Sequence, residues 1–248
     1  EDHIKERELA ERTAEDYRMH WTDKRRNTLY PYRNMHPRDI TRDDVRALKA
    51  RLQKRGKTMS SGALRVLRLT LSHAMRMDEG MKENPCKFVI IPPIPKREPE
   101  LIDLREFATK VIELPMMWRT LWTMSLLTAA RSASIRVMRR SDVDLDARTI
   151  RLTHVKTMKK GATLPIGMRL AELFERYLSE PTASEWLWPG NTKSKPMVAI
   201  WYRRFGYGTH QLRHNWTTLA TQAHVPFMEQ RLLMTHAVPG IGQVYTHP

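Results

Sequence analysis

The chain has 248 residues, which is enough for one large domain or for two of ordinary size. Its 43 Lys and Arg residues outnumber 27 Asp and Glu, and the formal net charge of +16 favours a polyanionic partner, most commonly nucleic acid, although a merely solvated basic surface stays open. The single cysteine excludes an internal disulfide and fits a reducing compartment, and the lack of a long apolar run excludes a membrane-spanning helix.

Residues 1–91 are predicted to be helical. Residues 5–22 are rich in helix formers, and Thr41 is a plausible N-cap for a helix that carries Asp43 and Asp44 in its first turn and ends before Gly56. Apolar residues then recur at helical spacing in two stripes, which are predicted to be core: Val45, Leu48 and Leu52, then Leu64, Leu67, Leu71, Ala74 and Met75. We expect a small helical bundle with basic outer faces, in which Arg65 and Arg68 are candidate DNA-binding residues.

A proline-rich stretch follows this helical segment. Four prolines, at positions 92, 93, 95 and 99, exclude a helix there, because proline lacks a backbone donor and restricts the residue before it. We therefore predict a linker at 92–99 between an N-terminal domain at 1–91 and a second domain at 100–248.

The second domain is predicted to mix helices with a small β-hairpin. Asp103 can cap a helix that runs to Leu114, and Pro115 opens an apolar helix at 116–129. Residues 147–156 and 162–167 alternate like two paired strands, with Lys159 and Lys160 in the turn between them. Further helices are expected at 168–179, 197–205, 209–223 and 226–234.

Several kinds of site are missing from the sequence. There is no glycine-rich phosphate loop, no Cys and His cluster at zinc spacing, and no acidic pair suited to magnesium, so a metal-dependent nuclease is unsupported. What is present is His210, Arg213 and His214, which share one face of a helix and could clamp a phosphate or form an ordinary basic surface.

Two further features favour phosphate chemistry. Arg131 ends an apolar helix, where a charge that cannot be lost needs an anionic or acidic partner. Tyr245 lies nine residues after His236 near the end of the chain, where a tyrosine could attack a phosphodiester.

Taken in order, these residues resemble the tyrosine recombinase (phage integrase) family. The resemblance implies a catalytic set of Arg131, a hairpin lysine, His210 and Arg213 of an HxxR box, His236 and the nucleophile Tyr245. Lys156 is our choice for the lysine, with Lys159 and Lys160 as rivals that also count as DNA-binding candidates. The fold so implied is mainly α with a small β-sheet, composed of a helical core-binding domain and an α+β catalytic domain.

The resemblance also implies a function. We expect a site-specific recombinase or integrase of a phage or mobile element, which cleaves and rejoins DNA through a 3′-phosphotyrosyl intermediate without metal or cofactor. Its expected partners are double-stranded recombination sites, three further copies in a homotetramer, and accessory DNA-bending or excision factors, in the cytoplasm of a bacterial host. A type IB topoisomerase, a non-catalytic DNA-binding protein of integrase ancestry and a basic RNA-associated scaffold are the alternatives.

The sequence departs from the family pattern at three places. Ala130 stands where a glycine–leucine pair often precedes the first arginine, Ser134 stands where an acid is frequent, and Met234-Thr235 replaces a common leucine–glycine. The chain starts with Glu1 rather than methionine and ends three residues after Tyr245, and the connection at 203–209 is short. We therefore expect a piece of a longer protein from which loop residues are omitted.

Overall fold

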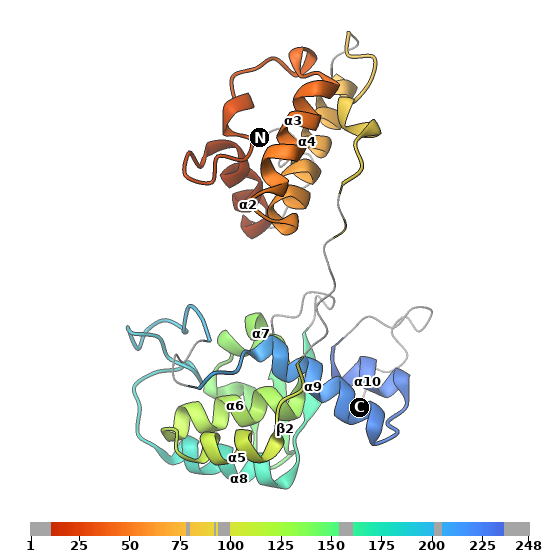
Figure 1. Ribbon diagram of the computed structural model, residues 1–248. Helices are drawn as coiled ribbons and strands as arrows, with labels where there is room; N and C mark the ends of the chain where they lie inside the picture. Colours follow the sequence, from red (N-terminus) through yellow and green to blue (C-terminus); the bar gives the residue numbers. More distant parts are fainter. Residues whose placement is uncertain are drawn as a thin grey trace. The chain divides into compact units, whose positions relative to one another are not determined.

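A computed structural model describes residues 11–77, 80–91, 93, 100–153, 161–200 and 205–235 of the chain. The chain divides into two compact units, Glu1–Arg97 and Glu98–Pro248, called here the N-terminal and the C-terminal unit (Figure 1). Each unit has a hydrophobic core of its own. No helix in the parts of the chain that the structure describes is both long and apolar enough to cross a bilayer.

The N-terminal unit is helical, as the sequence predicts. Its elements are α2 (Glu11–Thr22), η1 (Tyr30–Tyr32), η2 (Pro37–Asp39), α3 (Arg42–Gln53), α4 (Lys57–Met77) and η3 (Pro85–Phe88). Thr41 caps α3 in a capping box with Asp44, and α3 lies beside α4 (Figure 1). The two predicted apolar stripes meet there: Val45, Leu48, Leu52, Leu64, Leu67 and Leu71 are all buried, whereas Met75 is exposed.

The C-terminal unit combines helices with a small antiparallel sheet. Its helices are α5 (Leu104–Ile112), α6 (Met116–Thr128), α7 (Ser132–Arg136), η4 (Arg140–Asp142), α8 (Met168–Ser179), α9 (Thr209–Gln222) and α10 (Phe227–Leu233). The strands β1 (Val143–Asp144), β2 (Thr149–Leu152) and β3 (Ala162–Pro165) pair in the order β1-β2-β3, with Ile150 opposite Leu164. The mainly helical fold with a small sheet is as predicted.

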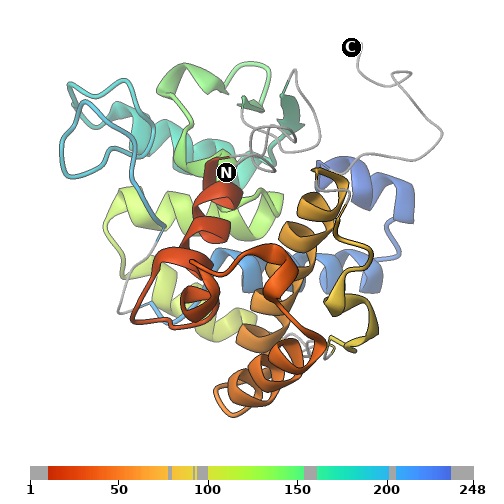
Figure 2. The ribbon, with the colours of Figure 1, turned by 90° about the horizontal axis from the view of Figure 1, so that it is seen from above.

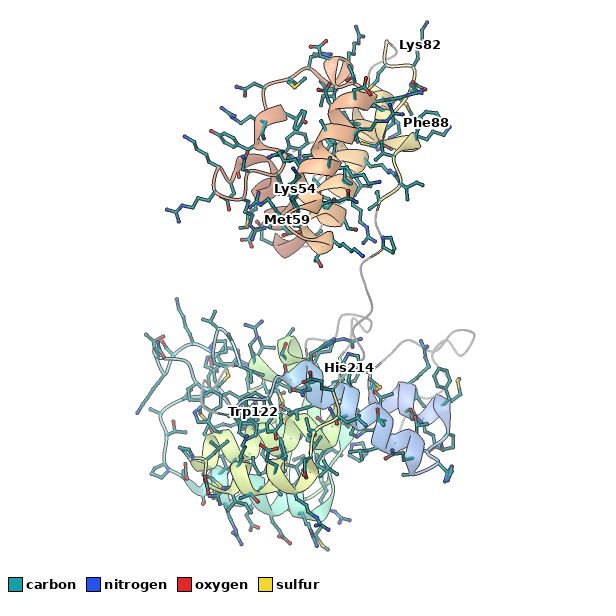
Figure 3. All side chains as sticks on the ribbon, viewed as in Figure 1. Lys54, Met59, Lys82, Phe88, Trp122 and His214 are labelled. Carbon is teal, nitrogen blue, oxygen red and sulfur yellow. The ribbon has the colours of Figure 1, made fainter. Side chains whose placement is uncertain are left out.

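Helix α6 lies at the centre of this unit. It packs against α5, α8 and α9, and its Trp122 is fully buried inside the unit (Figure 3). The Phe205 ring stacks on Trp122 with the ring centroids 4.8 Å apart, and it meets Phe107 of α5 edge-on. These contacts fix the chain just before α9 and thereby place α9 against α6.

The predictions fail in two places within the C-terminal unit. Residues 197–200 form a loop and not the start of a helix, because Pro196 pairs with Pro189 and the Met197 amide donates to the Trp188 carbonyl at 3.0 Å. An apolar run of that length does not distinguish a helix from a buried extended segment. The sequence also gave no indication of α7 or of β1, which are short elements of five and two residues.

Candidate active site

Arg131 lies in the turn between α6 and α7. Helix α6 ends at Ala129, which adopts a left-handed conformation with φ of 50°. The Thr128 hydroxyl helps to form this turn, because it donates to the Met124 carbonyl and accepts a hydrogen bond from the Ala130 amide. Arg131 is then extended at the N-cap of α7, and its side chain is half-buried.

Arg213 is the buried arginine of this region. Its side chain reaches from α9 to two backbone carbonyls: Nη1 donates to Ala129, and Nη2 donates to Met234 at 2.8 Å. Burial, followed by the neighbouring positive charge of Arg131, lowers the pKa of Arg213 to about 10. Arg213 thus connects the end of α6 to the end of α10 while keeping its guanidinium close to Arg131.

Thr235 completes this arrangement. It follows α10 with a positive φ of 54° and is 2% exposed. Its hydroxyl accepts a hydrogen bond from Nη1 of Arg131 at 3.3 Å. Three separate segments of the chain therefore converge, and we call Arg131, Arg213 and Thr235 the arginine site.

Helices α9 and α10 hold this site together. They contact one another, and Figure 2 shows α10, in darker blue, beside the end of α9. Asn215 of α9 is buried and accepts from the Ile102 amide at 2.7 Å, while the Trp216 indole donates to the Leu127 carbonyl of α6 at 3.1 Å. These two contacts of α9 could not be predicted from the sequence, because their partners are backbone groups of distant residues.

His210 and His214 form a pair on the exposed side of α9. Their Nε2 atoms are 3.1 Å apart and the rings meet edge-on, and Figure 3 shows His214 at the surface of the C-terminal unit. Partial burial lowers the pKa of His210, and the nearby positive charges of His214 and Arg213 lower it further. A hydrogen bond between the two Nε2 atoms requires that one ring donates and the other accepts.

The three residues of the predicted clamp do not share one environment. His210 and His214 are exposed, whereas Arg213 is 6% exposed and turns into the unit. The alternative of an ordinary exposed basic surface does not fit Arg213, because α9 packs on α6 and the Arg213 guanidinium donates to acceptors inside the unit. Lys156, Lys159, Lys160, His236 and Tyr245 lie outside the described residues.

The two arginines predicted to bind DNA from the N-terminal unit differ from each other. Nη2 of Arg68 donates to the carbonyls of Cys86 and Val89, at 2.7 and 2.9 Å, and so fixes η3 against α4. Arg65 lies one turn earlier on α4, is exposed, and lines an open pocket with Tyr17 and Ile91. The contacts of Arg68 favour a structural role, while DNA binding by either residue stays a prediction.

Within the described ranges, no group of three or more His, Cys, Asp or Glu side chains could hold a metal ion. The arginine site offers two guanidinium cations and a hydroxyl, which are groups that suit an anionic phosphate.

Comparison with known proteins gives the family. The phage integrase family model matches residues 98–248, which is more than half of the chain. The chain belongs to the phage integrase family. This integrase is accordingly a site-specific DNA recombinase of the tyrosine class, and no curated protein matches it in sequence at a significant level.

Solved structures agree with this assignment at the level of the fold. The Tn1549 transposon integrase bound to transposon right-end DNA aligns with a TM-score of 0.77 and 14% identity, over 96% of this chain and 90% of that one. A lambda integrase dimer bound to a COC′ core site aligns with a TM-score of 0.75 and 15% identity, over 96% of this chain and 93% of that one. A lambda integrase tetramer bound to a Holliday junction aligns with a TM-score of 0.73 and 14% identity, over 96% of this chain and 75% of that one.

Proposed function

We propose that this integrase cleaves and rejoins DNA strands with Tyr245 as the nucleophile and with Arg131 and Arg213 as ligands of the scissile phosphate. The observation that carries the proposal is the convergence of the two arginines from segments far apart in the sequence. Two guanidinium groups held close together repel each other, and this repulsion by Arg131 adds to the effect of burial in lowering the pKa of Arg213. A phosphate bound between them relieves that repulsion.

The proposed step needs no external energy source. The Tyr245 oxygen forms a bond to phosphorus while the bond from phosphorus to the 5′-oxygen breaks. His210 accepts the tyrosine proton, and Lys156 donates a proton to the leaving 5′-oxygen. Arg131, Arg213 and His236 stabilise the charge that grows on the non-bridging oxygens. Attack by a 5′-hydroxyl from another strand reverses the step and completes the exchange.

The proposed assembly is a homotetramer on two synapsed DNA sites. The fold similarity to a lambda integrase tetramer bound to a Holliday junction and the net charge of +16 support it. The N-terminal unit serves as the core-binding domain at 1–91 and the C-terminal unit as the catalytic domain at 100–248, joined by the linker at 92–99. Its setting is a phage or mobile element in the bacterial cytoplasm, with accessory bending or excision factors.

Covalent trapping tests the nucleophile. The protein is mixed with a nicked duplex that carries a candidate site, so that the leaving fragment diffuses away after cleavage. We expect a protein–DNA adduct that resists denaturant and is absent for Tyr245→Phe and Arg131→Ala, both of which should still bind DNA. Bound DNA without any adduct would instead identify a non-catalytic DNA-binding protein.

A second assay separates recombination from relaxation. Two sites placed on one supercoiled plasmid should be exchanged by the wild-type protein, and the products are read from restriction fragments. Relaxation of a plasmid that has no second site, without exchange, would identify a topoisomerase of type IB.

A further inference from the structure

The dipeptide Met234-Thr235 contacts both arginines of the arginine site. The Met234 carbonyl accepts from Arg213 at 2.8 Å, and the Thr235 hydroxyl accepts from Arg131 at 3.3 Å. Two successive residues thus hold the two guanidinium groups from one side. One contact is made by the Met234 backbone and the other by the Thr235 side chain, and both residues are buried.

We propose that Thr235 is a positioning residue for strand cleavage, and that its hydroxyl orients the Arg131 guanidinium toward the scissile phosphate. The inference rests on the proposed function of Arg131 as a ligand of that phosphate. Arginine has five N–H donors, so one bond to Thr235 leaves others for phosphate oxygens. The bond also removes side-chain freedom from a half-buried arginine before substrate arrives, which is how preorganisation lowers a barrier.

The backbone at Thr235 is unusual for its residue type. Non-glycine residues with positive φ in the described parts of the chain are Asn27, Ala129, Arg148, His224 and Thr235, and Thr235 alone among them is β-branched. A β-branched residue in the left-handed region is strained, and such strain persists only where surrounding contacts hold it. Here the Thr235 amide donates to the Leu232 carbonyl at 2.8 Å, and the side chain is buried.

A glycine would relieve this strain, but it has no hydroxyl. At position 235, the stability of the fold therefore favours glycine, whereas the orientation of Arg131 favours a residue with a hydroxyl. That opposition lets an experiment separate a positioning role from a merely structural one.

Three substitutions form the test, measured by single-turnover cleavage of the nicked duplex at saturating DNA. Thr235→Val keeps the shape and loses the hydroxyl, and we expect cleavage to slow by about tenfold with unchanged DNA affinity. Thr235→Ser keeps the hydroxyl and should cleave within about threefold of wild type. Thr235→Gly should unfold at a higher temperature than wild type and still cleave as slowly as Thr235→Val.

Arg131 variants distinguish the proposed role of Arg131 as a phosphate ligand from the positioning role of Thr235. In an Arg131→Lys background, Thr235→Val should add little further loss, because the two residues act as one unit. Wild-type cleavage by Thr235→Val, alongside an inactive Arg131→Ala, would overturn the positioning role alone. Cleavage by Arg131→Ala would overturn the proposed function of Arg131 and the inference with it.

Discussion

Two backbone carbonyls orient the guanidinium group of Arg213. The carbonyls of Ala129 and Met234 are neutral acceptors, so these two hydrogen bonds orient the guanidinium without bringing a negative charge to it. A carboxylate at either place would hold the arginine equally well and would compete with a phosphate. The polarity of these acceptors therefore favours a site that binds anions.

The histidine pair gives a prediction about pH. Because the pKa of His210 lies below its ordinary value of 6.5, its ring stays neutral and able to accept a proton at pH 6.5. The cleavage rate should fall only when the pH drops through this lowered pKa. His214→Asn removes one of the neighbouring positive charges, so the fall should begin at a higher pH, as a pH–rate profile would show.

His224→Asn is the matched control for that profile. His224 is an exposed histidine of the same unit with a φ of 56°, a conformation that asparagine tolerates. Its substitution should leave the inflection unchanged. An inflection that stays in place in His214→Asn as well would argue that His210 is not the base.

The sequence predicted the members of the arginine site better than its contacts. Arg131 and Arg213 stand out from the order and spacing of charged residues, and the structure brings them together. The partners of Arg213 are backbone carbonyls of residues 129 and 234, and a backbone carbonyl has no signature in a sequence. In the sequence, Thr235 is only a departure from the family pattern, because its contact with Arg131 is visible only in the structure.

At the level of elements, caps and periodicity account for most of what could be predicted. Asp103 accepts from the amides of Arg105 and Glu106 and starts α5 where expected, and α8 spans the predicted 168–179. The loop at 197–200 has the apolar composition of a helix, but the Met197 amide donates to the Trp188 carbonyl and the preceding Pro196 pairs with Pro189, a tertiary effect that local sequence does not reveal. The short β1 depends in the same way on its pairing with β2.

Helix α4 offers a paired test of DNA binding and stability. Arg65→Ala should change the free energy of unfolding by less than about 0.5 kcal/mol. It should also reduce the slope of log affinity against log salt by about one, as expected for a lost phosphate contact. Arg68→Ala should cost about 1–3 kcal/mol of stability, because the carbonyls of Cys86 and Val89 lose their donor.

Urea unfolding and a DNA-binding titration at several salt concentrations measure both quantities. An unchanged salt slope for Arg65→Ala would remove Arg65 from the DNA interface. An Arg68→Ala variant of unchanged stability, with a reduced slope of log affinity against log salt, would instead indicate that Arg68 contacts DNA.

At the scale of the whole molecule, the single cysteine, Cys86, can report the unfolding of the N-terminal unit alone. Cys86 is 2% exposed in the core of the N-terminal unit, and burial raises the pKa of its thiol to about 11. Its alkylation at neutral pH should therefore be slow until that unit opens. Asn215 lies in the other unit, where it accepts from the Ile102 amide.

We predict that the two units lose structure separately. Asn215→Ala leaves a buried amide without its acceptor and should destabilise the C-terminal unit by about 1–3 kcal/mol, measured by thermal unfolding. The rate of Cys86 alkylation should stay at the wild-type value in this variant. Faster alkylation would show that the units open together.

The position of Met234 and Thr235 in the chain matters during synthesis. A ribosome makes residues 129–131 and then Arg213 well before the two residues that hold both guanidinium groups. A nascent chain that has already emerged as far as α9 still lacks those acceptors, so its two guanidinium groups are not yet held together. The arginine site is therefore complete only after the end of α10 has been made.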